Sequence, residues 1–123
     1  MEKIILDTNF LLIPFYFKVD IFSEIQRISD FKYTLFILDK TIDELDNIIK
    51  VQSGKSVKAA KFALDMIRLK KIKKIRTGDG DVDDLLLDQE AIIATQDRLL
   101  IDRLKKKGKK IIRLRQKKYL SLK

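Results

Sequence analysis

Short apolar runs and longer amphipathic runs alternate along the chain. Residues 3–6 and 34–38 are apolar and β-rich, and they end at Asp7 and Asp39, as expected for buried strands. Between them, residues 20–28 place their apolar side chains on one face of a helix. The pattern therefore opens with a strand, a helix and a second strand.

The later part of the chain repeats this alternation. In order, we expect helices at 41–51 and 55–71, a strand at 74–76, a loop at 77–81, a helix from about 82, a strand at 91–95, a helix at 98–107 ending at Gly108, and a last strand at 110–114. Pro14 is expected to kink a first helix that follows the opening strand. Because strands joined by helices form right-handed crossovers, the sequence predicts an α/β fold, a three-layer α/β/α sandwich with a mostly parallel central sheet.

Length and composition limit the architecture. The 123 residues suit a single domain over 1–123, with a basic C-terminal strand and tail at about 109–123. The chain has no cysteine, and its opening apolar run is too short for a signal peptide. No apolar stretch approaches the roughly 18 residues of a membrane helix, so no membrane association and a cytoplasmic location are expected.

Charge and the absence of histidine narrow the chemistry. Lysine and arginine number 27 against 18 acidic residues, and the net charge of +9 favours a polyanionic partner such as a phosphate backbone. Without histidine or cysteine, hydrolytic chemistry would depend on oxygen ligands, which favour Mg²⁺ or Mn²⁺. Combined with the acidic positions described next, this composition favours a metal-dependent nuclease that acts on a polyanion.

Four acidic residues follow or flank the predicted strands: Asp7, Glu44, Asp83 and Asp97. In a parallel sheet, the carboxyl ends of the strands share one edge, where open α/β sheets bind their ligands. Carboxylates gathered there repel one another and raise each other's pKa values, and a divalent cation relieves this repulsion. Together the four acids favour a metal site.

Each of these acids also has a structural interpretation. Thr41 and Glu44 have the spacing of a helix capping box, and Asp97 has the position of a helix N-cap. Asp7 could hold an Asx-turn. Capping does not explain a carboxylate at the end of a buried strand, which is costly without a cation or several hydrogen-bond donors.

Four acidic segments occur in order along nearly the whole chain: Leu6-Asp7-Thr8-Asn9-Phe10-Leu11, Asp43-Glu44-Leu45, Val82-Asp83-Asp84-Leu85-Leu86 and Ile93-Ala94-Thr95-Gln96-Asp97-Arg98. In this arrangement the chain resembles the PIN-domain endoribonucleases. The late segment is most similar to the branch that processes ribosomal RNA and its archaeal relatives, and the chain length also fits VapC-type toxins.

The resemblance implies a site and a reaction. Asp7, Glu44, Asp83 and Asp97 would be catalytic and would surround Mg²⁺ or Mn²⁺, with Asp81 and Asp84 as further candidate acids. Thr8, Asn9 and Thr95 would orient ligands or water. RNA phosphodiester bonds would be hydrolysed by metal-activated water.

Three functions remain open on this basis: an endoribonuclease of ribosomal RNA processing, the toxin ribonuclease of a toxin–antitoxin pair, and a PIN-like RNA-binding module without catalysis. The partners implied are RNA, a second copy of the chain in a homodimer, and an antitoxin or a ribosome-assembly protein.

Basic and aromatic residues are unevenly distributed. The basic residues expected to bind RNA are Arg98, Arg103, Lys105, Lys106 and Lys107, although a solvated surface would have the same composition. An early aromatic cluster comprises Phe10, Phe15, Tyr16, Phe17 and Phe22. Core packing or a dimer surface is favoured for this cluster over base stacking.

Overall fold

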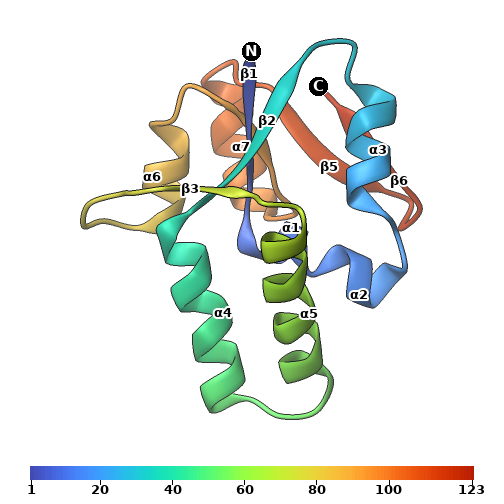
Figure 1. The fold of residues 1–123 in the computed structure, drawn as a ribbon. Helices are drawn as coiled ribbons and strands as arrows, with labels where there is room; N and C mark the ends of the chain where they lie inside the picture. The colour runs from blue at the N-terminus through green and yellow to red at the C-terminus, as the bar shows by residue number, and fades with distance from the viewer.

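The computed structural model describes residues 1–123 and contains six strands and seven helices (Figure 1). The strands are β1 (Glu2–Leu6), β2 (Tyr33–Leu38), β3 (Lys73–Ile75), β4 (Ile92–Ala94), β5 (Ile111–Arg115) and β6 (Tyr119–Leu122). The helices are α1 (Thr8–Leu11), α2 (Ile13–Phe17), α3 (Ile21–Ile28), α4 (Asp39–Val51), α5 (Lys55–Leu69), α6 (Val82–Leu87) and α7 (Arg98–Lys106). None of the helices combines the length and apolarity that a membrane-spanning segment requires.

All six strands form one sheet in the order β3-β2-β1-β4-β5-β6. Strands β1 to β5 run parallel, and only β6 is antiparallel to its neighbour β5. The central strand β1 pairs with β2 on one side and with β4 on the other, so its carboxyl end lies in the middle of the sheet edge. The predicted mostly parallel sheet is confirmed.

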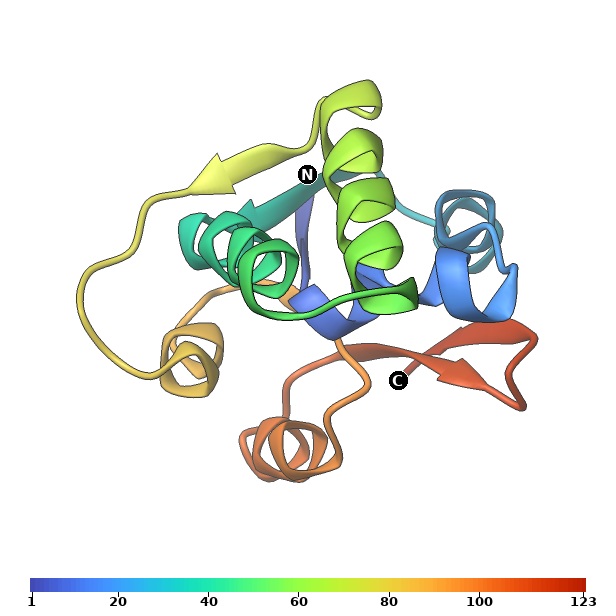
Figure 2. The same ribbon diagram turned by 90° about the horizontal axis from the view of Figure 1, so that it is seen from below.

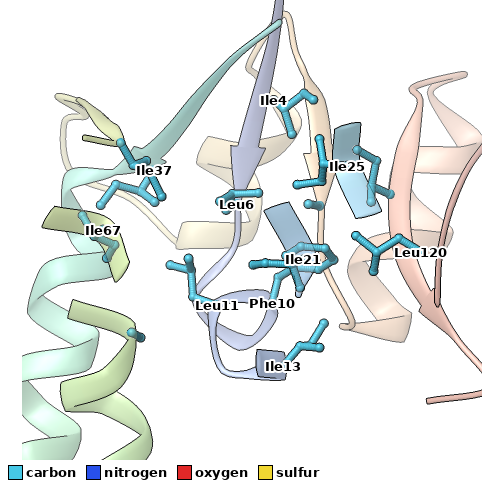
Figure 3. Packing of buried hydrophobic residues seen from close by; sticks show 14 of the residues in the cluster. Ile4, Leu6, Phe10, Leu11, Ile13, Ile21, Ile25, Ile37, Ile67 and Leu120 are labelled. Atoms are coloured by element: carbon cyan, nitrogen blue, oxygen red, sulfur yellow. The ribbon is translucent and has the colours of Figure 1, made fainter. Parts of the chain in front are cut away.

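Helices cover both faces of this sheet, as the two hydrophobic clusters and Figure 2 show. Alternate residues of β1 point to opposite faces: Ile4 and Leu6 belong to the larger cluster of 19 buried residues, and Ile5 belongs to the smaller cluster of 9. Helices α1 to α5 contribute to the larger cluster, shown in Figure 3, and α6 and α7 contribute to the smaller one. This arrangement confirms the three-layer α/β/α sandwich.

The structure contains the predicted basic C-terminal strand as β5, and the residues expected to form a tail after it form a hairpin with β6. Gln116 and Lys117 both have positive φ angles, of 51° and 57°, and the Lys118 amide donates to the Arg115 carbonyl at 3.0 Å. Two central residues with positive φ suit the twist of an antiparallel hairpin. The sequence lacks glycine or asparagine at this turn, so the turn and β6 were missed.

Two helix starts also differ from the sequence pattern. Helix α4 begins at Asp39 and has Leu38 as its N-cap, so the capping-box interpretation of Thr41 and Glu44 is wrong. The first helix is two short helices, and Pro14 lies in the first turn of α2, where its missing N–H costs nothing. At the other end of the chain, Gly108 follows α7 with a φ of 70°, as expected for a helix stop.

The early aromatic residues divide between interior and surface. Phe10 is completely buried in the larger cluster, whereas Tyr16 and Phe17 on α2 are 45% and 40% exposed. The interior position of Phe10 agrees with the core interpretation.

Candidate active site

Asp7 lies at the centre of the carboxyl edge of the sheet, directly after β1. Its side chain is only 8% exposed, and its carboxylate accepts two hydrogen bonds, from the Thr8 amide to Oδ1 and from the Thr95 hydroxyl to Oδ2, both at 2.8 Å. The Asp7 amide donates to the Ala94 carbonyl at 2.9 Å, which fixes the residue against β4. Asp7 is also the N-cap of α1, but its side chain accepts from the amide of the next residue, Thr8, and not from Asn9, so the Asx-turn interpretation is wrong.

The Asp7 carboxylate is electrostatically strained. Burial raises its pKa above the usual value of 3.8, and the hydrogen bonds from Thr95 and Thr8 only partly oppose this rise. The negative charges of Glu44 and Asp97 raise the pKa of Asp7 further. A cation beside Asp7 would reverse these unfavourable contributions.

Thr8 joins Glu44 to Asp7 although the two acids are far apart in the sequence. The Thr8 hydroxyl donates to Glu44 Oε1 at 2.8 Å and lies 3.2 Å from the Thr41 hydroxyl, which is buried in α4. Glu44 is therefore oriented by the residue that follows Asp7. The contact comes from the packing of α1 against α4 and replaces the local capping box that the spacing suggested.

Thr95 joins Asp97 to Asp7 from the other side. Its fully buried hydroxyl donates to Asp7 and accepts a hydrogen bond from the Asp97 amide at 3.1 Å. Asp97 Oδ1 accepts from the Leu100 amide at 3.2 Å and so caps α7, as the sequence indicated. Its position close to Asp7 shows that capping and site membership are compatible.

Asn9 binds the segment after β4 through a residue that the sequence analysis missed. Asn9 Oδ1 accepts a hydrogen bond from the Gln96 amide at 3.1 Å, and Gln96 Oε1 accepts one from the Leu114 amide at 2.7 Å. Gln96 thus connects β5 to the loop that contains Thr95. Nothing in the sequence distinguishes this glutamine except its place between Thr95 and Asp97.

Asp83 lies in the first turn of α6, near Asp97 and Asp7. Burial raises its pKa above the usual value of 3.8, and the charges of Asp97, Asp7 and Asp81 add to this increase. Asp81 is the N-cap of α6, but its side chain makes no capping hydrogen bond. The structure therefore brings Asp83 near two of the other predicted acids, Asp97 and Asp7, with Asp81 also nearby.

The carboxylate of Asp84, the residue after Asp83, forms an ion pair with a basic side chain. Its Oδ1 accepts a hydrogen bond from Arg103 Nη2 of α7 at 2.6 Å. This hydrogen bond is the main reason that the pKa of the Arg103 guanidinium is raised. The pair assigns Asp84 and Arg103 to each other, so we leave Asp84 out of the proposed metal-binding acids.

Asp39 is a second position that the sequence analysis left out of the site. Its carboxylate accepts hydrogen bonds from the Thr77 hydroxyl at 2.6 Å, from the Thr77 amide at 3.1 Å and from the Lys40 amide at 3.0 Å. Asp39 therefore fastens the loop at 77–81 to the start of α4. The remaining basic candidates, Arg98, Lys105, Lys106 and Lys107, are all exposed on or beside α7.

The acidic side chains suit a hard cation, but they do not form a closed cage. No group of three acidic side chains is close enough to hold a metal ion by itself. Mg²⁺ commonly keeps several of its waters and takes only one or two protein carboxylates, and Mn²⁺ also prefers oxygen ligands. The buried, strained carboxylate of Asp7 and its acidic neighbours fit a divalent ion bound in this open manner.

The fold is that of a mostly parallel α/β protein, with acidic side chains at the carboxyl end of its central strand. Residues 4–117 match the family described as "PIN like domain", and the chain belongs to this family.

Named relatives agree with this assignment. The chain is 28% identical over 127 residues to "Ribonuclease VapC4" of Methanocaldococcus jannaschii, covering 99% of this chain and 97% of that protein. Its fold is similar to the "PIN domain endonuclease Utp24", with a TM-score of 0.75 and 20% identity over 98% of this chain and 90% of the other. A domain of a functionally unknown protein from Methanocaldococcus jannaschii is also similar, with a TM-score of 0.60 and 16% identity over 94% of this chain and 92% of that domain.

Proposed function

We propose that the chain is a metal-dependent endoribonuclease that hydrolyses RNA phosphodiester bonds. The observation that carries this proposal is the buried carboxylate of Asp7, which Thr8 joins to Glu44 and Thr95 joins to Asp97. The ribonuclease named among the relatives supports RNA as the substrate, and the net charge of +9 favours a polyanion.

Each site residue has a role in this proposal. Asp7, Glu44, Asp83 and Asp97 would surround Mg²⁺ or Mn²⁺, one or two of them binding it directly and the others through its bound waters, and Asp81 would support Asp83. Such an ion supplies Lewis-acid chemistry, since it lowers the pKa of bound water and balances charge on the phosphate. Thr8 and Thr95 hold the carboxylates in place, and Asn9 holds the loop at Thr95 and Gln96 through its hydrogen bond.

Two biological roles are compatible with this chemistry. The first candidate is ribosomal RNA processing, because the late acidic segment resembles the PIN-domain branch that processes ribosomal RNA. In this role the chain would act in the cytoplasm, as a single PIN-like domain with a ribosome-assembly partner. The second candidate, a toxin with an antitoxin partner, is favoured by the named VapC relative. The toxin role requires that expression of the chain alone arrests growth. Exposed Tyr16 and Phe17 on α2 are consistent with a homodimer in either role.

The test is cleavage of a mixed-structure RNA by the purified chain in Mn²⁺, in Mg²⁺ and in EDTA. We expect cleavage only with metal, and a loss of roughly 100-fold or more in Asp7→Asn and Glu44→Gln. Asp43→Asn is the matched control, since Asp43 is an exposed acid next to Glu44 on the same helix. Asparagine at position 7 can still accept from the Thr8 amide, so Asp7→Asn should fold, which circular dichroism would verify.

Cleavage that persists in EDTA or in folded Asp7→Asn would contradict the proposal. Tight RNA binding without cleavage by either protein would favour the binding module instead. The buried carboxylate of Asp7 argues against that module, because a site that only binds RNA gains nothing from a buried negative charge.

A further inference from the structure

A pocket of about 370 Å³ lies between α6 and α7, beside the acidic site and apart from it. Its lining residues are Asp84, Leu87, Asp88, Arg103, Lys106 and Lys107. None of these residues is among the proposed metal-binding acids, but Asp84 is adjacent in sequence to Asp83. The charges of Asp83 and Asp81 also act on Arg103, so a group bound beside Arg103 would lie near the proposed acidic site.

The charges of the pocket suit one phosphodiester. Three basic side chains and two carboxylates line it, which leaves a net charge of +1. Lys106 and Lys107 have no acidic side chain within ion-pair distance, because the ion pairs of the structure involve Arg27, Arg68 and Arg103 only. One backbone phosphate of RNA has the complementary charge of −1.

In the Asp84–Arg103 ion pair at the pocket, another anion can replace the Asp84 carboxylate. The two paired side chains are 61% and 47% exposed, and exposed ion pairs contribute little to stability because water and salt screen them. In the free protein, the hydrogen bond from Arg103 Nη2 to Asp84 Oδ1 at 2.6 Å directs the guanidinium toward Asp84. A phosphate oxygen offers arginine the same kind of acceptor as a carboxylate oxygen.

We propose that this pocket is a subsite for an RNA backbone phosphate that flanks the scissile bond. In the free protein, the Asp84 carboxylate binds Arg103 as the phosphate would. When RNA binds, its phosphate displaces the Asp84 carboxylate from Arg103. Lys106 and Lys107 supply the additional positive charge. This inference rests on the proposed function, because RNA is the ligand of both sites.

The two members of the pair should have opposite effects on RNA binding. We would titrate a labelled single-stranded RNA with the full chain in EDTA and measure fluorescence anisotropy at several salt concentrations. Arg103→Gln and, independently, Lys106→Gln should each weaken binding roughly threefold and reduce the salt dependence by about one counterion. Asp84→Asn should tighten binding by a similar factor, because Arg103 loses its internal competitor.

The chain contains a matched control pair on the opposite side of the sheet. Asp65 and Arg68 of α5 form another exposed ion pair, at 3.0 Å. Asp65→Asn and Arg68→Gln change the net charge in the same way as the pocket variants. They should alter RNA affinity less than about twofold.

Two results would overturn the proposal. If Asp84→Asn weakens binding as Arg103→Gln does, the pair is only a brace between α6 and α7. If the control variants match the pocket variants, overall charge explains the binding. Since these measurements are made without metal, they are independent of cleavage. A failed Asp7→Asn test would refute the nuclease and with it the place beside a scissile bond, whereas the binding of an RNA phosphate in the pocket is decided by the anisotropy measurements alone.

Discussion

Thr8 and Thr95 organise the acidic edge at the scale of single residues. A hydroxyl group both donates and accepts hydrogen bonds, which allows one side chain to connect two polar groups. Thr95 donates to Asp7 and accepts from the Asp97 amide, and Thr8 donates to Glu44 from the position next to Asp7. The carboxylates are therefore oriented by the protein itself.

Asp39 is the residue for which we predict a pH effect. Hydrogen bonds from the Thr77 hydroxyl, and then from the Thr77 amide, lower the pKa of Asp39 below 3.8. A lowered pKa in the folded state stabilises the protein above the unfolded value, and this stabilisation is lost as the pH falls through the folded value. Asp39→Asn should therefore lower the melting temperature at about pH 7, and the gap should close below about pH 3.8.

Thermal unfolding followed by circular dichroism between about pH 7 and pH 2.5 would measure this gap. Asp46→Asn, an exposed change on the same helix, is the control and should show little difference at any pH. A gap that stays constant down to the lowest pH would mean that the charge of Asp39 is not what fastens Thr77.

At the scale of elements, α3 protects the open edge of the sheet. The Glu24 carboxylate accepts from the Leu120 amide at 2.9 Å, and Arg27 Nη2 donates to the Leu120 carbonyl at 3.0 Å. Glu24 and Arg27 also bind each other at 2.8 Å. These side chains satisfy both backbone groups of Leu120 as a further strand would, which is one of the ways in which proteins protect an edge strand from association.

Removal of this contact should both destabilise and expose β6. Glu24→Ala leaves the Leu120 amide without its partner, and we expect a loss of about 1 kcal/mol in the free energy of unfolding. Urea denaturation would measure the loss, and size-exclusion chromatography would detect association through the freed edge. Gln26→Ala, an exposed change on α3, should do neither. Unchanged stability in Glu24→Ala would show that water replaces the carboxylate without cost.

At the scale of the whole molecule, the acidic site lies in a basic protein. The larger hydrophobic cluster lies on the face covered by α1 to α5, and the smaller one lies on the face covered by α6 and α7, so the carboxyl edge of the sheet lies between two helical layers (Figure 2). The net charge of +9 attracts RNA over the whole surface, while the local carboxylates attract a cation.

Substitution of two adjacent leucines of α7 would test the packing of the smaller hydrophobic cluster. Leu100 is fully buried in the cluster of nine, whereas Leu99 is 76% exposed. Leu100→Ala should reduce the free energy of unfolding by roughly 2–5 kcal/mol through the cavity that it leaves. Leu99→Ala should change it by less than about 0.5 kcal/mol. Urea denaturation would compare them, and equal effects would contradict the packing of α7 on the sheet.

Much of this structure could be predicted because the signals are local. Apolar runs and helical spacing identified the parallel strands and most helices, and their ends differ from prediction by a residue or two. The β5–β6 hairpin was missed because Gln116 and Lys117 adopt positive φ without the usual turn residues. The start of α4 was misplaced because the capping-box spacing of Thr41 and Glu44 occurs inside the helix.

The sequence by itself determined the fold class and the four acids that follow or flank its strands, since hydrophobic periodicity and chain order are properties of the sequence alone. Only the tertiary structure decided how these acids are held. The hydrogen bond from Thr8 to Glu44 spans 36 positions of the sequence, and the one from Thr95 to Asp7 spans 88. The ion pair of Asp84 and Arg103 spans 19 positions. Such contacts depend on which helices pack together, which spacing along the chain does not encode.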